Sequence, residues 1–337
     1  MNLETKAYDI PVVLFVFRRL DTVKMIIEKL KEVKPQEVYI FSDGARDDRE
    51  DEQHKVQTVR EYLDSAIDWQ CHVHKEYASQ NKGCAKNICE GINQVFSVEK
   101  KAIILEDDAV PMTEFFQYCK ILLEKYESNK KIQYIAGFNA VGDTECIKES
   151  YSFSYTAPMS GAIATWADRW NECDFTMRTW PNRKRDGSLK KYFFSHELYC
   201  QNCNAFEDSY HNVNDGWDYQ FHYDMLDKER YAIVPKGNLV RSYGYTEGAF
   251  HEQGNRVAKR LIKIMDYTHL LFAFPMDVPK SVVWNQDYDR IRQQKFLEVN
   301  GNYLERHCSY LLRGVKDCAY KYMPTKLWNF GKMLIKR

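Results

Sequence analysis

Hydrophobic positions in the first half of the chain follow two alternating periods. Short apolar runs, typical of strands buried on both faces, are separated by segments with apolar residues every three or four positions, typical of amphipathic helices. The predicted strands cover Pro11–Phe17, Glu37–Gly44, Trp69–Lys75, Ala102–Glu106 and Ile132–Phe138. The predicted helices cover Thr22–Val33, Val56–Ile67, Cys84–Phe96 and Phe115–Tyr126. This alternation predicts an α/β fold with a mostly parallel central sheet flanked by helices.

The second half of the chain is less regular and is rich in Trp, Tyr, Asn and Gly. A helix is predicted over Trp217–Glu229 and a short strand over Tyr231–Pro235. We expect this half to form part of a binding site more than to extend the sheet. Because no repeat or low-complexity linker interrupts the chain, one continuous domain is predicted over residues 1–300, followed by a tail over 301–337.

Composition narrows the class of protein. The 337 residues are 44% hydrophobic, which is enough for a sizeable core, and the 48 Lys and Arg balance 48 Asp and Glu. A zero net charge argues against a nucleic-acid partner, because such proteins usually carry a basic field. The ten Cys show no disulfide framework, and Cys200 and Cys203 have no second pair to complete a zinc site. Free thiols, no visible secretory signal and no window of ~20 apolar residues favour a cytoplasmic location.

The most informative chemistry follows the fourth predicted strand. Glu106, Asp107 and Asp108 come directly after its apolar residues, at the strand end where open α/β sheets bind ligands. Clustered carboxylates repel one another and require a compensating cation, for which Mg²⁺ or Mn²⁺ with a substrate phosphate is the natural choice. In contrast, the acids of the RDDREDEQ run (Asp47, Asp48, Glu50 and Asp51) have no adjacent apolar strand, and we expect them on the surface.

The C-terminal tail is basic and aromatic. From Ser309 to Arg337 there are seven Lys or Arg and one acid, a surplus of six positive charges. The segment Thr325–Arg337 alternates apolar and basic residues, as in a segment that lies on an anionic membrane surface. A C-terminal helix docked on the domain with its basic face in water fits the pattern equally well. Peripheral contact with the inner face of a cytoplasmic membrane is therefore one of two open interpretations.

Several motifs together resemble known sugar transferases. The segment Asn81–Tyr118, which contains ILEDD followed by a Pro and paired Phe, resembles the core of the animal alpha-mannoside beta-1,2-N-acetylglucosaminyltransferase family. Bacterial sugar transferases described as haemolytic-protein-like are similar over more of the chain, from about Pro11 to Asp289. The motifs shared with them are GAIATWADRW at Gly161–Trp170, WDYQF at Trp217–Phe221 and PKGNLVRSYGYTEGAFH at Pro235–His251. The chain departs from their pattern at Arg18–Leu20 and Phe250–Glu252.

The resemblance implies a fold and an activity. Both groups imply the GT-A fold, a Rossmann-like nucleotide-diphospho-sugar transferase fold that uses Mn²⁺ or Mg²⁺. Residues 1–140 would bind the nucleotide sugar, for which a UDP-sugar is favoured, and residues 141–300 would bind the acceptor. The implied reaction moves a hexosyl or N-acetylhexosaminyl group to a hydroxyl of a glycan or lipid-linked saccharide, with inversion.

Site roles follow from the same resemblance. Asp108 is expected to ligate the metal, and Glu106 and Asp107 to contact ribose hydroxyls or metal-bound water. His251 would complete the metal shell or touch the diphosphate, with a structural role as the alternative. The expected general base is Asp218, with Asp215 as the second choice, although Asp218 also suits a helix N-terminus.

The remaining candidates concern the nucleotide and the sugar. The residues expected near the nucleotide are Phe15, Arg18, Asp43, Asn81, Lys82 and Gly83. Phe15 fits a core position equally well, and Asp43 and Gly83 also fit ordinary turns. Trp217 would lie beside a sugar or in the core, and Gly161 would let the backbone approach the donor. Trp166 and Trp170 are expected in the core.

Two other function classes remain open at this stage. A non-catalytic carbohydrate-binding protein of the same fold would retain the acid motif without turnover. A sugar-1-phosphate nucleotidyltransferase shares a similar core but needs a Gly-rich, Arg-containing loop after the first strand. The sequence FVFRRLDT has no Gly at that place, which argues against this second class.

Overall fold

The structure, a computed structural model, describes residues 8–141, 145–159, 161–213, 216–244 and 272–299. The chain divides into two compact units, Met1–Gln293 and Gln294–Arg337, and the described part of the second is the end of one helix. The first unit therefore contains the described fold. The predicted boundary between domain and tail, at residue 300, remains a prediction.

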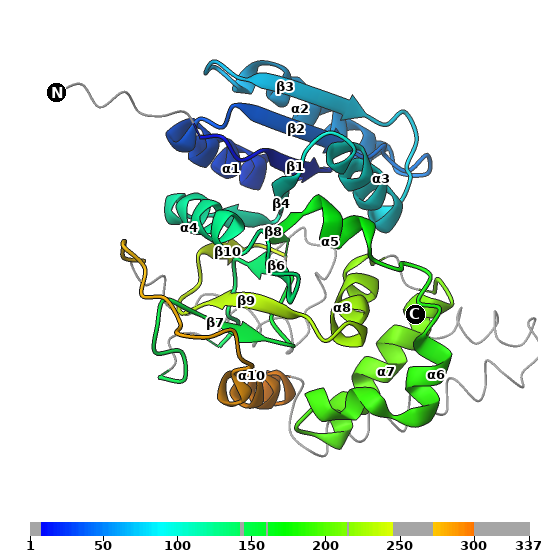
Figure 1. Ribbon diagram of the computed structural model, residues 1–337. Helices are drawn as coiled ribbons and strands as arrows, with labels where there is room; N and C mark the ends of the chain where they lie inside the picture. Colours follow the sequence, from blue (N-terminus) through cyan, green and yellow to red (C-terminus); the bar gives the residue numbers. More distant parts are fainter. Residues whose placement is uncertain (1–7, 142–144, 160, 214–215, 245–271, 300–337) are drawn as a thin grey trace, which may run out of the picture. The chain divides into compact units, whose positions relative to one another are not determined.

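The main sheet has eight strands in the order β3-β2-β1-β4-β8-β6-β9-β7 (Figure 1). Its strands are β1 (Val12–Val16), β2 (Glu37–Ser42), β3 (His72–Tyr77), β4 (Lys101–Glu106), β6 (Ile132–Ala136), β7 (Tyr151–Ser154), β8 (Ala162–Trp166) and β9 (Tyr231–Pro235). The pairs among β1 to β4 are parallel, as is β6 with β9, whereas β8 and β7 run antiparallel to their neighbours. The predicted α/β fold with a mostly parallel sheet is confirmed.

Helices connect these strands. They are α1 (Leu20–Val33), α2 (Glu50–Ala66), α3 (Cys84–Phe96), α4 (Thr113–Lys125), α5 (Ala167–Asn171), α6 (Trp180–Asp186), the 3-10 helix η1 (Ser188–Tyr192), α7 (His196–Tyr210), α8 (Asp218–Asp227) and α10 (Gln286–Val299). A second, two-stranded sheet pairs β5 (Ala109–Pro111) antiparallel with β10 (Val240–Ser242). This small sheet matters for the site, because β5 follows the acids of β4 directly.

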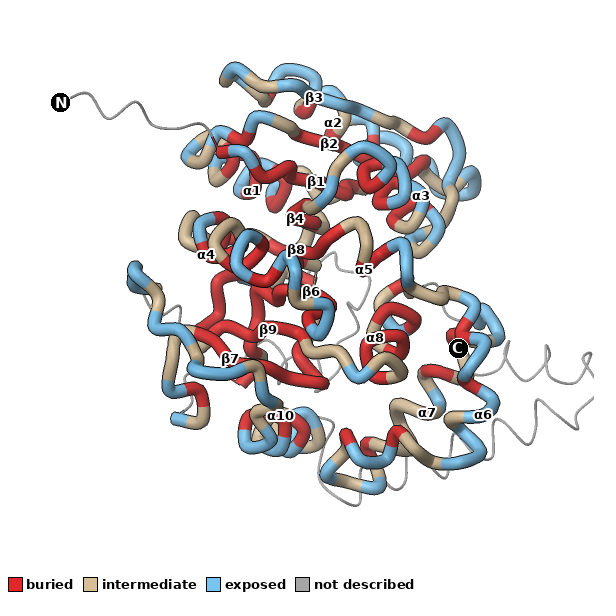
Figure 2. Tube along the Cα trace, in the orientation of Figure 1, coloured by how far each residue is buried: buried red, intermediate tan, exposed pale blue. Residues whose placement is uncertain are grey.

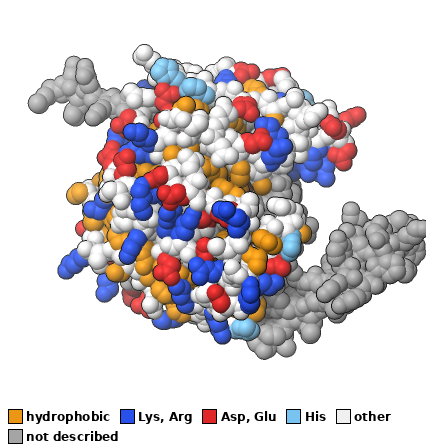
Figure 3. Space-filling view, turned by 45° about the vertical axis from the view of Figure 1, so that its right-hand side comes forward, with side chains coloured by type: hydrophobic (Ala, Val, Ile, Leu, Met, Phe, Trp, Pro, Cys, Tyr) orange, Lys and Arg blue, Asp and Glu red, His pale blue; other side chains and the backbone are white. Residues whose placement is uncertain are grey.

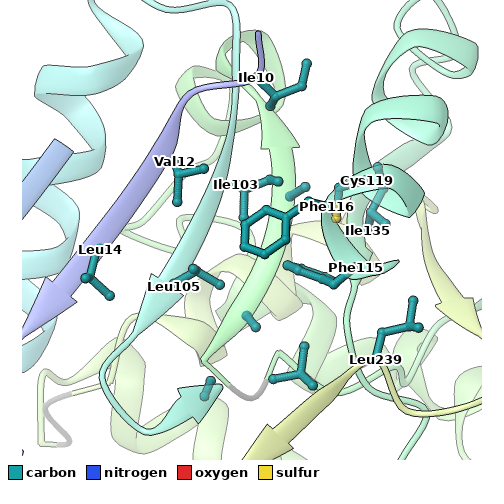
Figure 4. Packing of buried hydrophobic residues seen from close by; sticks show 14 of the residues in the cluster. Ile10, Val12, Leu14, Ile103, Leu105, Phe115, Phe116, Cys119, Ile135 and Leu239 are labelled. Carbon is teal, nitrogen blue, oxygen red and sulfur yellow. The ribbon is translucent and has the colours of Figure 1, made fainter. Parts of the chain in front are cut away.

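Alternate residues of the central strands pack on opposite faces of the main sheet. Val12 and Leu14 of β1 point to the side covered by α1, α2 and α4, where they share one hydrophobic cluster with Phe116, which lies beside Ile103 of β4 (Figure 4). Val13 and Phe15 point to the side covered by α3 and α8. Figure 2 shows the resulting continuous burial of β1, β4, β6 and β9. Two covered faces explain why these strands are mostly apolar.

The second half of the chain extends the sheet, contrary to our expectation. β7, β8 and β9 come from this half, and β8 lies between β4 and β6. The β8 strand falls within the GAIATW segment, whose apolar residues are too few to predict a strand from period alone. Trp166 and Trp170 lie in the core, as expected, with 2% and 1% exposure. They do not share a helix, because Trp166 ends β8 and Trp170 lies in α5.

Charged residues on the surface are mixed in sign. Figure 3 shows acidic and basic side chains interspersed over the face drawn there. Asp47, Asp48, Glu50 and Asp51 are exposed, as predicted. In the described part of the chain, no helix is both long enough and apolar enough to span a bilayer. Cys200 and Cys203 are free thiols.

Candidate active site

The acid triplet lies at the carboxyl edge of the parallel strands. Glu106 is the last residue of β4, and Asp107 and Asp108 form the turn into β5. Since β1 pairs in parallel with β4, the residues after β1 reach the same edge. The backbone N–H of Phe17 donates a 2.8 Å hydrogen bond to Asp107 Oδ2. The topology therefore brings the ends of these two strands together at the acids.

Arg19 is the cation nearest to this triplet among the contacts of the described residues. Its Nε lies 3.9 Å from Asp107 Oδ1, and one of its terminal nitrogens lies 3.6 Å from Asp108 Oδ2. It also donates a hydrogen bond to the Tyr243 carbonyl, after β10. Arg19 thus links three segments at the site. No role for Arg19 could be predicted from the sequence, because an Arg pair after a strand carries no specific signal.

Two glycines enclose the Asp108 carboxylate. Gly161 has a positive φ of 64°, and a Cβ added there would lie 2.9 Å from Asp108 Oδ1. A Cβ added at Gly244 would lie 2.9 Å from Asp108 Oδ2. Either position therefore has no room for a side chain next to Asp108. Gly161, which was expected near the donor, directly precedes β8 and accepts the backbone hydrogen bond of Glu106 N.

The electrostatics of the triplet reflect excess negative charge. Desolvation and the neighbouring carboxylates of Asp108, Asp218 and Asp107 raise the pKa of Glu106 well above its ordinary value. Desolvation also raises the pKa of Asp107 to about 6, although Arg19 and the Phe17 N–H act in the opposite direction. Among the described residues, the carboxylates of this cluster outnumber the guanidinium groups of Arg19 and Arg18 that act on it, and an added cation would offset the remaining negative charge.

The donor set is compatible with a divalent cation. Asp108 is partly exposed, at 29% of its side chain, and it offers the carboxylate oxygens that Mg²⁺ and Mn²⁺ prefer. Within the described ranges, no three Asp, Glu, His or Cys side chains are gathered so that they alone could hold an ion. Protein ligands would therefore need to be completed by oxygens from elsewhere. His251, the second predicted ligand, lies outside the described residues.

Asp218 belongs to the same constellation. It is the first residue of α8, and its charge contributes to raising the pKa of Glu106. A Cβ added at Gly216 would lie 2.8 Å from Asp218 Oδ1, so the backbone passes close to this carboxylate. Trp217 is buried, at 4% exposure, against Trp170. Its described contacts are therefore core contacts. Asp215, the alternative base, lies outside the described residues.

Asp43 holds the loop that precedes α3. Its Oδ1 accepts the N–H groups of Gly44 and Lys82, and its Oδ2 accepts those of Gly83 and the Asn81 side chain, at 2.8–3.1 Å. Desolvation raises the pKa of Asp43, and the three backbone N–H groups lower it. Four donors occupy the usual acceptor capacity of a carboxylate. Asp43 therefore positions Asn81, Lys82 and Gly83 at this edge.

Phe15 and Arg18 have different surroundings. Phe15 is buried at 4% exposure, stacks on Phe41 with ring centres 5.2 Å apart, and packs under Gly91 of α3. Its contacts are those of a core residue. Arg18 lies at the strand edge and donates a 3.2 Å hydrogen bond to Glu52.

Two residues of α2, Glu52 and Arg60, hold the ends of the strands in place by hydrogen bonds, and neither could be predicted from the sequence. Glu52 lies in the acidic RDDREDEQ run, yet its side chain is fully buried between Arg18 and Arg46. Arg60 donates hydrogen bonds to the carbonyls of Asp43 and Ala78, which follow β2 and β3. Because Glu52 stands among exposed acids, the pattern of apolar and polar residues does not distinguish it from them.

Comparisons with known proteins give weak likenesses only. No protein-family model matches the chain, and no curated protein matches it in sequence. The chain is similar to the mannosyltransferase PcManGT from Pyrobaculum calidifontis in complex with GDP-Man and Mn2+, with 10% identity and a TM-score of 0.40; the match covers 96% of this chain and 84% of that one. It is also similar to a UTP-bound UGPase from Acinetobacter baumannii, with 9% identity, a TM-score of 0.33 and coverage of 69% and 88%. Likenesses this weak assign no function.

Proposed function

We propose that the protein is a metal-dependent glycosyltransferase that moves a sugar from a nucleotide diphosphate to a hydroxyl group. One observation carries the proposal. The charges of Asp107, Asp108 and Asp218 act on Glu106 at the carboxyl edge of a parallel sheet, and among the described residues Arg19 forms ion pairs with two of these acids. An α/β sheet binds its ligands at this edge, and the excess charge suits a divalent cation and the diphosphate that comes with it.

On the donor side, Asp108 would hold Mn²⁺ or Mg²⁺, together with His251 and the diphosphate oxygens. When bound, such an ion neutralises the diphosphate as a leaving group. Glu106 and Asp107 would accept hydrogen bonds from the ribose or from water at the ion. Arg19 forms ion pairs with the carboxylates of Asp107 and Asp108, at 3.9 and 3.6 Å.

The nucleotide would lie along the edges of β1 and β2. Asn81, Lys82 and Gly83 form a loop that Asp43 fixes, and Arg18 is fixed by Glu52. Both sets are thus held in place before a ligand arrives, which lowers the ordering cost of binding. We favour a UDP-sugar as the donor.

On the acceptor side, Asp218 would take the proton from the attacking hydroxyl. The carboxylate lies at the first turn of α8, where the Glu106 charge reaches it. Direct attack on C1 of the sugar would invert its configuration. We propose a glycan or lipid-linked saccharide as the acceptor, and the tail over 301–337 as the segment to examine for membrane contact.

A thermal-shift screen of nucleotide sugars, with and without Mn²⁺, tests the proposal. A transferase is stabilised by one class of donor only when Mn²⁺ is present, in proportion to the logarithm of ligand concentration. Slow hydrolysis of that donor then separates a transferase from a carbohydrate-binding protein. If no nucleotide sugar stabilises the protein with Mn²⁺, the proposal is wrong.

A further inference from the structure

One face of α10 carries three polar side chains toward the interior of the first unit. Tyr288 and Asp289 are fully buried, and Arg292 follows them by four and three positions, which places it on the same helical face. The Tyr288 hydroxyl donates a hydrogen bond to the Asn139 carbonyl. The first turn of α10 is therefore packed against the first unit on this face, and Arg292 lies in the second turn of the helix.

Arg292 has a buried nitrogen without a partner. Its Nε is enclosed, and no hydrogen-bond acceptor contacts it in the part of the chain that the structure describes. A buried donor of this kind is costly unless an acceptor satisfies it. The Nε of Arg292 is thus a buried donor on this face for which the described residues supply no acceptor.

The acid on the same face is already occupied. Asp289 accepts hydrogen bonds from the side chains of Ser154, Thr156 and Trp284, and from the Tyr155 backbone N–H. Four donors use the normal capacity of a carboxylate, so Asp289 has none left for the arginine. The charge of Arg292 instead acts on Tyr134, Tyr288 and His222. At neutral pH these three side chains carry no negative charge.

The surroundings connect Arg292 to the proposed base. The segment from Tyr155 to Ala157 is contacted by Asp289 of α10, by His222 of α8 and by Tyr134 of β6. His222 lies four positions after Asp218, hence one turn further along the same face of α8. The charges of both Arg292 and Asp218 act on the pKa of Tyr134, the first lowering it and the second raising it. Arg292 therefore lies on the α8 side of the site, away from the β1 and β2 edge.

We propose that Arg292 binds an oxyanion carried by the acceptor, a phosphate or a carboxylate close to the reactive hydroxyl. The inference rests on the proposed function, because it places this group on the acceptor side of Asp218. A guanidinium offers a planar pair of N–H donors that matches both oxyanions. The bound oxyanion would accept a hydrogen bond from the buried Nε and place a negative charge opposite the guanidinium.

Calorimetric titration with inorganic phosphate, and separately with glucuronate, tests this assignment without donor or metal. We expect at least one of them to bind the wild-type chain and to bind Arg292→Gln ~10-fold more weakly, or not at all. The matched control is Arg290→Gln, two positions earlier in α10, whose exposed side chain pairs with Asp287. This control should bind as the wild type does. The probe that binds identifies the oxyanion.

Two outcomes overturn the proposal: neither probe binds the wild type at millimolar concentration, or Arg292→Gln binds as tightly as the wild type. If Arg292→Gln unfolds, Arg292→Lys replaces it, since it keeps the charge but loses the paired donors; unchanged binding by a folded Arg292→Lys also counts against the proposal. Mn²⁺-dependent UDP binding, measured in parallel, should be the same in Arg292→Gln and wild type. Its absence from the wild type would instead indicate failure of the proposed transferase function.

Discussion

Arg18 donates a 3.2 Å hydrogen bond to Glu52, whose carboxylate is fully buried and also binds Arg46. The pKa of Glu52 is lowered, and the hydrogen bond from Arg46 is the largest cause. Desolvation acts in the opposite direction, and the charges of Arg46 and Arg18 lower the pKa further. Glu52 therefore stays charged and fixes Arg18 at the end of β1. In the proposed enzyme, this relationship makes Glu52 a positioning residue for the nucleotide.

Replacing Glu52 with Gln tests that role. The amide keeps the shape but loses the charge, so we expect unfolding free energy to fall by about 1–3 kcal/mol. The KM for the donor should rise by roughly tenfold with little change in kcat, because Arg18 is released and Asp218 is untouched. Urea denaturation and steady-state kinetics measure both. Glu50→Gln, an exposed acid in the same turn of α2, is the control, and an equal change there would contradict the assignment.

Replacing Asp108 with Asn tests the metal site. The substitution removes the charge that the ion requires and leaves the side chain nearly unchanged in size. We expect Mn²⁺-dependent UDP binding to be lost in calorimetry, with a Tm close to that of the wild type. Asp47→Asn, in the exposed acidic run, should bind UDP as the wild type does. Undiminished UDP affinity in Asp108→Asn would exclude Asp108 as a ligand.

Replacing Asp218 with Asn tests the general base. Removal of a base from the reacting hydroxyl lowers turnover by ~10²-fold or more. Donor binding should be preserved, because the carboxylate would act on the acceptor. Initial rates and UDP calorimetry separate the two effects. If Asp218→Asn keeps its turnover while Asp215→Asn loses it, the base is Asp215.

The sequence predicted those features that depend on local pattern. α3 begins and ends at the predicted residues, and the predicted β9 is also unchanged, because the period of apolar residues alone fixes them. α2 begins earlier than predicted, at Glu50, since acids in a first turn favour a helix N-terminus even without apolar residues. The acid triplet was found because it follows a buried strand directly.

Features that depend on distant partners could not be predicted. Glu52 is buried only because Arg18 and Arg46 meet it, and nothing in its own run distinguishes it from its exposed neighbours. The hydrogen bonds of Asp43 to Lys82 and Gly83, nearly forty positions later, could not be read from its own segment, and its expected contact with the nucleotide stays a prediction. Arg19 likewise has a role only because the fold brings it close to Asp107 and Asp108. Such contacts are properties of the folded chain and not of its periodicity.

A pair of glycines allows the space around Asp108 to be tested separately from backbone strain. Gly161 and Gly187 have nearly the same positive φ, 64° and 66°, but an added Cβ meets Asp108 only at Gly161. At Gly187 its nearest atom is the Tyr199 hydroxyl at 3.7 Å. Both Ala variants should lose about 1–2 kcal/mol of stability through the left-handed backbone. Only Gly161→Ala should also weaken Mn²⁺-dependent UDP binding; equal affinities would show that Asp108 tolerates the methyl group.

His222 gives the fold a specific dependence on pH. Desolvation lowers its pKa from 6.5 to about 4, although the hydrogen bond to the Tyr155 carbonyl opposes the change. Between these values the unfolded chain binds a proton at His222 more readily than the folded chain does. The stability that neutral His222 contributes is therefore fully present above pH 6.5 and is lost as the pH falls toward 4. We expect the urea midpoint of the wild type to decrease relative to that of His222→Gln as the pH falls over this range. His54→Gln, a substitution of an exposed histidine in α2, is the control and should keep the wild-type slope. The raised pKa of Asp107 adds stability to the folded chain as the pH falls over the same range, which opposes the effect of His222. The difference between the slopes of the two variants therefore isolates His222, and identical slopes would mean that its burial has no effect on stability.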